Sequence, residues 1–187
     1  MRELDETRRG YLERALEMLK EYEPSAEFIE PFYSGPSAIL HVKLNEVEYV
    51  FKPALVIADN EQLPKEARIL NDLRNVRGIT HLVEKYCNKL GVRAILKEFF
   101  PGKKLGWHEQ IRSPQLRKKL EDTIAEIHQV GYVHLDLHEG NIIISDDETN
   151  ICFIDPIQGH TLMSTSERKR NIDKSLLKQL FYPANYI

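Results

Sequence analysis

Three polar residues that could act together lie within and just after residues 132–144. Asp136 is followed five positions later by Asn141, directly before an apolar run. Asp155 comes directly after the next apolar stretch, 151–154. One carboxylate can orient a hydroxyl group and accept its proton, while an amide oxygen and a second carboxylate are ligands that suit Mg²⁺. The three residues therefore favour transfer of a phosphoryl group from a metal-bound nucleotide to an alcohol.

A short hairpin is the element expected to bring these residues together. Residues 142–144 and 151–154 are apolar, and the segment between them is polar. Two such runs around a polar turn predict a hairpin. Because a hairpin returns its second strand beside its first, Asn141 and Asp155 would flank one metal site.

The rest of the chain shows the periodicity of both helices and strands. Apolar residues at helical spacing predict helices at four places: from the start of the chain to near Pro24, from Pro64, from Ser113 to Gly131, and from Ser166 onward. Alternating patterns predict strands at 38–43, 47–52, 79–86 and 92–99. Pro101 and Gly102 break the pattern and mark the expected join between two lobes.

The segment HLDLHEGNIII resembles the catalytic loop of the protein-kinase-like superfamily, H-x-D-x-x-x-x-N followed by a hairpin and an Asp. The residues of this segment are similar to those of aminoglycoside and choline kinases and of RIO-type atypical protein kinases. The resemblance implies that Asp136 is catalytic and that Asn141 and Asp155 bind the metal. Only 32 residues follow Asp155, which resembles the minimal RIO and Bud32-like branch. Leu135 replaces the usual arginine of the loop, and Asp155-Pro156-Ile157 replaces D-F-G.

The resemblance extends upstream to the positions that bind the nucleotide phosphates. Lys52 ends a predicted strand, as does the lysine of the family that reaches the α and β phosphates. Glu66 on the following helix is its expected ion-pair partner, although Glu61 lies nearby. Gly35 and Ser37 stand where a phosphate-covering loop is expected, with one glycine in place of the usual three.

A second part of the resemblance concerns adenine. Residues 96–102, which include Glu98 and Phe99, resemble the hinge whose backbone binds the base. Together these positions imply ATP and Mg²⁺, with Mn²⁺ as a substitute, as the cofactors of an ATP-dependent kinase.

These features predict an α+β chain with a two-lobed protein-kinase-like fold. We expect one domain over residues 1–187, with a helix and an antiparallel sheet in 1–100 and a reduced, mainly helical lobe in 101–187. The expected acceptor is a serine or threonine hydroxyl of a protein substrate. A small-molecule acceptor, of the aminoglycoside or choline type, is the alternative.

Two other classes of protein use some of the same residues. His134, Asp136 and His138 alternate as H-x-D-x-H, a ligand pattern of metal-dependent hydrolases, with Asp155 and His160 downstream. That interpretation leaves Lys52 and Asn141 without a role. A nucleotide-binding pseudokinase scaffold is the other alternative, favoured by the single glycine of the phosphate loop and by the missing D-F-G glycine.

Composition limits the environment and the partners. The formal net charge is −3, which argues against bulk binding of nucleic acid. A basic run, Arg168, Lys169 and Arg170, predicts either a solvated helix face or a dock for RNA or an acidic partner. Two distant cysteines and a charged N-terminus without a membrane span or a leader indicate a cytoplasmic protein. The oligomeric state stays open.

Overall fold

The computed structural model describes residues 6–34, 37–106, 109–133, 136–156, 160–161 and 167–181. The chain divides into two compact units. The first unit comprises Met1–Arg68 and His81–Phe99, and the second comprises Ile69–Thr80 and Phe100–Ile187. The boundary thus falls within a helix and returns the short segment before His81 to the second unit.

The first unit contains a five-stranded antiparallel sheet with the order β1-β2-β3-β5-β4. The strands are β1 Glu27–Ser34, β2 Ser37–Leu44, β3 Val47–Pro53, β4 Leu82–Asn88 and β5 Gly91–Glu98. The two predicted strands at 38–43 and 47–52 are confirmed as β2 and β3. Strand β1 was not predicted, because Pro31 interrupts its pattern; an edge strand tolerates a proline that a central strand would not.

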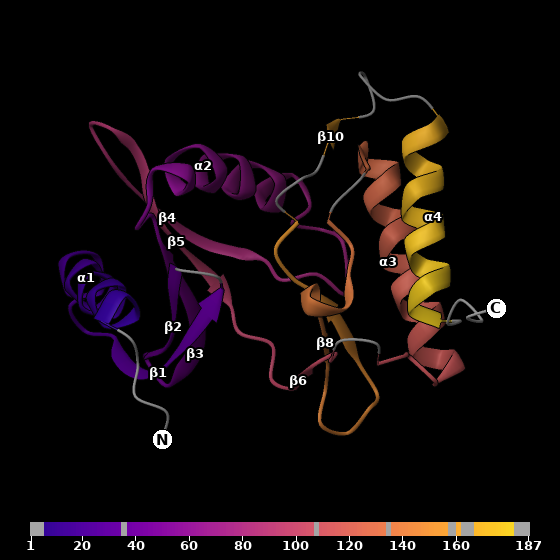
Figure 1. Cartoon of the computed structure of the whole chain (residues 1–187), viewed down its shortest axis with the longest axis horizontal. Coiled ribbons are helices and arrows are strands. Elements are labelled where there is room, and N and C mark those ends of the chain that lie inside the picture. The colour runs from indigo at the N-terminus through magenta and orange to yellow at the C-terminus, as the bar shows by residue number, and fades with distance from the viewer. Residues whose placement is uncertain are drawn as a thin grey trace. The chain divides into compact units, whose positions relative to one another are not determined.

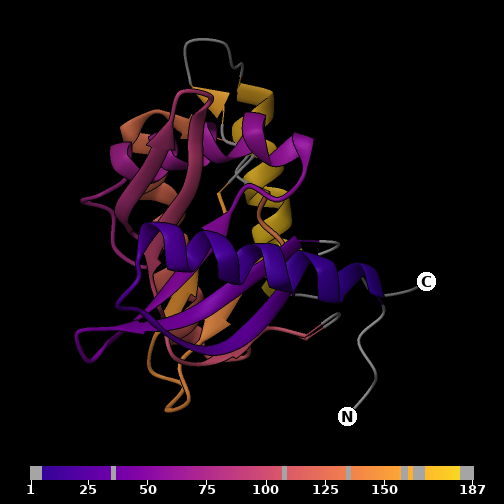
Figure 2. The same ribbon diagram turned by 90° about the vertical axis from the view of Figure 1, so that its left-hand side faces the viewer.

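Helix α1, Glu6–Tyr22, packs against one face of this sheet (Figure 2). Its buried residues Ala15 and Leu19 join a core with side chains from the central strands, among them Leu40 and Phe51. Because side chains alternate along a strand, the residues between these point to the opposite face. Side chains on that opposite face can therefore contact other residues of the first unit.

Helix α2 runs from Ile57 to Asp72, so the predicted start at Pro64 is wrong. The side chain of Asp59 accepts hydrogen bonds from the backbone N–H groups of Leu55 and Val56, at 2.9 and 3.0 Å. Asp59 is the third residue of the helix, and its side chain reaches back to the two residues before the first turn, as in a capping box. Pro64 lies inside α2, where it lacks the N–H that would bond the carbonyl of Asn60. A proline is thus a weaker start signal here than an aspartate that caps.

The second unit combines short strands with two long helices. The two long helices are α3 Pro114–Val130 and α4 Glu167–Phe181. The unit also contains the last residues of α2 and the 3₁₀ turn η1 Glu139–Asn141. Its strands are β6 Lys103–Lys104, β7 Tyr132–Val133, β8 Ile142–Ile144, β9 Ile151–Phe153 and β10 His160–Thr161. Helices α3 and α4 pack side by side (Figure 1). The predicted limits of α3 are confirmed: Ser113 accepts a hydrogen bond from Leu116 N, and Gly131 ends the helix with φ 105°.

The predicted hairpin is present as β8 and β9, joined antiparallel and extended by β6 into a three-stranded sheet. The predicted strand at 79–86 is correct only from Leu82 onward. Ile79 pairs in parallel with Phe153 instead, and the backbone N–H of Phe153 donates to Gly78 O at 2.8 Å. The segment before β4 therefore supports the hairpin of the second unit, a contact that local periodicity does not encode.

Two expectations about the environment can be compared with the described residues. None of their helices is long and apolar enough to cross a lipid bilayer. Cys87 is exposed and Cys152 is buried, and both are free thiols.

Candidate active site

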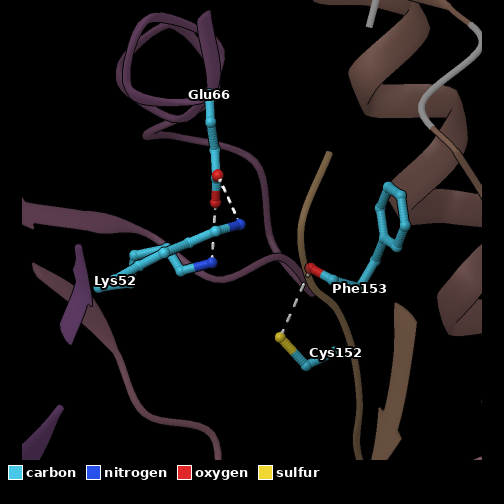
Figure 3. A network of polar contacts seen from close by, with 5 residues as sticks. Lys52, Glu66, Cys152 and Phe153 are labelled. Carbon is cyan, nitrogen blue, oxygen red and sulfur yellow. Dashed lines mark hydrogen bonds and ion pairs between the residues drawn. The ribbon is translucent and has the colours of Figure 1, made fainter. Parts of the chain in front are cut away.

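The first unit contains a carboxylate, that of Glu66, which forms ion pairs with two lysines. Nζ of Lys52 donates to Oε2 of Glu66 at 2.8 Å, as Figure 3 shows. A second lysine, Lys97, donates to Oε1 of the same carboxylate, also at 2.8 Å. The structure therefore brings the two expected residues together and adds a third that sequence reasoning missed.

The strand register explains why both lysines reach the same carboxylate. Lys52 of β3 lies opposite Ile95 of β5, and Val50 lies opposite Lys97. Residues directly opposite each other point to the same face, so the two lysines are diagonal neighbours. Glu66 approaches them from α2. The sequence holds a partial signal for Lys97: it lies two positions after Ile95 in an apolar strand, and residues at this spacing share one face of the sheet.

Burial makes this cluster electrostatically demanding. The side chain of Glu66 is 1% exposed and that of Lys97 is 4% exposed. Removing such charges from water is costly, and their mutual attraction offsets the cost only when the geometry is good and hydrogen bonds satisfy them. Here each oxygen of Glu66 receives a hydrogen bond from a lysine, so the carboxylate is held in one orientation.

The hinge positions of the first unit have partners of their own. Oε2 of Glu98 lies 2.9 Å from Nδ1 of His81, and the backbone N–H of Glu98 donates to His81 O at 3.0 Å. The ring of Phe99 stacks on His41, with 3.9 Å between ring centroids. Phe32 lies beside them, 5.6 Å from His41. The Glu98 side chain is thus engaged with its own sheet, and Phe99 belongs to an aromatic cluster.

The expected phosphate loop falls mostly outside the described residues. Gly35 lies outside them altogether. Ser37 is described only by its backbone, which begins β2 and pairs with Ser34.

In the second unit, the loop before β8 is closed by a hydrogen bond between two expected site residues. Nδ2 of Asn141 donates to the backbone carbonyl of Asp136 at 3.0 Å. Because this bond uses the amide nitrogen, it directs the amide oxygen elsewhere. The side chain of His138 accepts from Gly140 N at 3.0 Å and so caps η1. The Asp136 carboxylate itself is 36% exposed, with Nε2 of His138 at 3.9 Å from it.

The hairpin places Asn141 and Asp155 at the same end of β8 and β9. The N–H of Ile154 donates to Asn141 O at 2.8 Å, which continues the β8–β9 ladder by one step. Asp155 follows directly, with φ 54°, and Asp136 has φ 62°. Left-handed backbone is uncommon for residues other than glycine, and the proline after Asp155 restricts its backbone further. Such outliers cluster at functional sites.

Amide and carboxylate oxygens are ligand types that fit a hard divalent cation. Mg²⁺ takes oxygen ligands and is held by one or two carboxylates together with phosphates and water. Asn141 and Asp155 supply donors of this kind. The residues that the structure describes in this unit therefore suit the metal that the sequence implies.

Comparisons with known proteins reveal the fold. No protein-family model matches the sequence, and no curated protein matches it. Among solved structures, the kinase PK-1 of the Cydia pomonella granulovirus is similar, with a TM-score of 0.57 and 13% identity. The match covers 80% of this chain and 57% of the viral chain. The chain has a protein-kinase-like fold.

Within this kinase-like fold, the first unit contains the antiparallel sheet, α1 and most of α2, and the second contains the loop–hairpin segment, α3 and α4. The expected α+β class is confirmed. The chain spans 57% of the length of the viral kinase chain. A likeness at this identity establishes the fold, and the roles of individual residues stay predictions.

Two further predictions fall partly outside the described residues. His134 of the H-x-D-x-H pattern is not described. Among the residues that are, no three His, Cys, Asp or Glu side chains gather as a metal-binding group. The basic run Arg168, Lys169 and Arg170 lies in α4, but only its backbone is described.

Proposed function

We propose that this chain is an ATP-dependent phosphotransferase, an atypical serine/threonine protein kinase of the RIO-like minimal branch. The observation that carries the proposal is the arrangement of Asp136, Asn141 and Asp155 around the β8 and β9 hairpin of a kinase-like fold. The paired Lys52 and Glu66 of the first unit support it independently.

In the proposed reaction, Lys52 binds the phosphates of ATP. A lysine at the end of a sheet strand is suited to this because its ammonium is a compact, strongly charged donor. Glu66 orients Lys52 through the 2.8 Å hydrogen bond. The buried position of Glu66 limits the directions that Lys52 can take, which lowers the entropy lost when a phosphate binds.

Asp136 positions the acceptor hydroxyl and accepts its proton. The hydroxyl oxygen forms a bond to the γ-phosphorus, the bond from that phosphorus to the bridging oxygen breaks, and ADP leaves. Partial exposure of the Asp136 carboxylate, at 36%, is consistent with a group that must reach an incoming substrate. Asn141 and Asp155 would hold Mg²⁺, which would neutralise charge on the phosphates.

Calorimetric titration with ATP, with and without Mg²⁺, tests the proposal first. The wild-type chain is expected to bind ATP more tightly with Mg²⁺. Lys52→Ala is expected to lose most of this affinity, and Asp155→Ala is expected to lose the Mg²⁺-dependent part alone. Lys85→Ala, which changes an exposed lysine of the same sheet, serves as the matched control and should bind as wild type.

Transfer of labelled phosphate then tests the acceptor. A serine- or threonine-containing protein substrate is expected to be labelled, whereas aminoglycosides and choline are not. Labelling of the small alcohols alone would move the proposal to the small-molecule kinases. Absence of ATP binding by the wild-type chain would contradict the nucleotide-dependent function altogether.

A further inference from the structure

Lys97 shares the carboxylate of Glu66 with Lys52, and the proposed function gives it no role. Each carboxylate oxygen has its own lysine, Oε1 for Lys97 and Oε2 for Lys52. The side chain of Lys52 is 14% exposed, against 4% for Lys97. The lysine assigned to phosphate is therefore the outer one, and Lys97 is the inner one.

The buried carboxylate needs a cation at all times. A charge that loses its partner inside a protein is strongly unfavourable, because water is not there to replace the partner. When Lys52 turns toward a phosphate oxygen, its hydrogen bond to Glu66 weakens or lengthens. Lys97 is placed to stay on Oε1 during such a change, because it donates from the buried side of the carboxylate.

We propose that Lys97 is a positioning residue for phosphate binding: it keeps the Glu66 carboxylate paired, so that Lys52 can engage the nucleotide phosphates. This inference rests on the proposed function, because it takes Lys52 as the phosphate ligand. Without Lys97, Lys52 would be the main partner of a buried carboxylate, and each phosphate contact would compete with that ion pair. The effect should therefore appear for ligands with phosphates and be absent for those without.

Affinities for Mg-ATP and for adenosine, measured calorimetrically on the full chain, test this role. Lys97→Met keeps most of the length of the side chain and removes its charge. It is expected to weaken Mg-ATP binding about tenfold, as for the loss of one hydrogen bond between charged groups, and to leave adenosine binding unchanged. Lys85→Met is the matched control in the same sheet and should change neither affinity.

A double variant separates positioning from direct phosphate contact. Glu66→Gln combined with Lys97→Met removes the buried negative charge together with its inner partner. If Lys97 acts through Glu66, the double variant should bind Mg-ATP as tightly as Glu66→Gln alone. Weaker binding by the double variant would show that Lys97 contacts phosphate itself, and would overturn the inference. This comparison also decides the matter if Lys97→Met alone does not fold.

The outcomes also distinguish the inference from the proposed function. No binding of ATP by the wild-type chain removes the proposed function and the inference together. Normal Mg-ATP affinity in a folded Lys97→Met variant, with wild-type binding intact, removes the inference alone. Equal losses for ATP and adenosine would indicate a general effect on the sheet and would likewise overturn it.

Discussion

The two units hold their candidate site residues by different physical means. In the first unit, Lys52, Glu66 and Lys97 come from three elements, and the hydrogen-bonded pairs are 14 and 31 residues apart in the chain. In the second unit, Asn141 and Asp136 are five residues apart and bond through a backbone carbonyl. The first cluster depends on buried charge, whereas the second depends on local backbone geometry.

This difference predicts which changes affect stability and which affect chemistry. A buried charge that loses its partners destabilises the fold around it. The Asp136 side chain is partly exposed, and Asn141 is held by the backbone carbonyl of Asp136. The side chain can therefore be replaced without leaving a buried charge unpaired. Substitutions in the first cluster should therefore reduce both folding and binding, while the side chain of Asp136 should matter for the reaction alone.

Asp136→Asn is the variant expected to have the largest effect on rate. It should reduce phosphate transfer by about 10²–10⁴-fold, the usual contribution of a general base. Asparagine tolerates the left-handed backbone that φ 62° requires, and the carbonyl that accepts from Asn141 is unchanged. Nucleotide affinity and the urea midpoint should therefore match wild type. Near-normal transfer in this variant would refute the catalytic role of Asp136.

Glu66→Gln is expected to have the largest effect on stability. It removes the negative charge between the buried Lys97 and the part-buried Lys52, and breaking such a cluster costs about 3–5 kcal/mol. The free energy of unfolding from urea titration measures the change. Glu61→Gln, at an exposed position of the same helix, is the matched control and should lie within about 0.5 kcal/mol of wild type. A similar loss in both variants would contradict the difference between the two units.

Gly78→Ala should destabilise the second unit through its backbone. Gly78 has φ 73°, and an added Cβ would lie 2.3 Å from Oγ1 of Thr123. The left-handed conformation costs about 1–2 kcal/mol, and overpacking adds about 1–3 kcal/mol. Gly131→Ala, with φ 105° and open space around it, is the control that measures the cost of the left-handed backbone alone. Urea unfolding of both variants should show a larger loss for Gly78→Ala.

The smallest expected effect concerns the β8–β9 turn. Hydrogen bonds from the Ser145 hydroxyl and from the N–H and hydroxyl of Thr149 lower the pKa of Asp147 to about 2. A carboxyl group whose pKa is lowered in the folded state stabilises the fold at pH values above its ordinary pKa of 3.8. This stabilisation is lost as the pH falls toward about 2. Urea midpoints of wild type and Asp147→Asn should differ at pH 5 and converge near pH 2. A constant difference would contradict this linkage.

The local parts of the fold and of the site followed from the sequence. Helix α3 was predictable at both ends, because Ser113 and Gly131 satisfy its terminal groups within a few residues. The hairpin that carries Asn141 and Asp155 was predictable because two short apolar runs flank a polar turn. The expected pairing of Lys52 with Glu66 agrees with the observed 2.8 Å contact.

Features that depend on distant segments did not follow from the sequence. The pairing of Ile79 with Phe153 and the edge strand β1 need partners that local periodicity does not specify. Lys97 is the clearest case. Whether a lysine in an apolar strand meets a carboxylate depends on the register of β3 with β5 and on the helix that covers them. The short-range spacing of the chemical groups can be read from the sequence, because turns, caps and alternation act over a few residues. The burial and pairing of charge were decided by tertiary contacts, since they arise only when separate elements pack together.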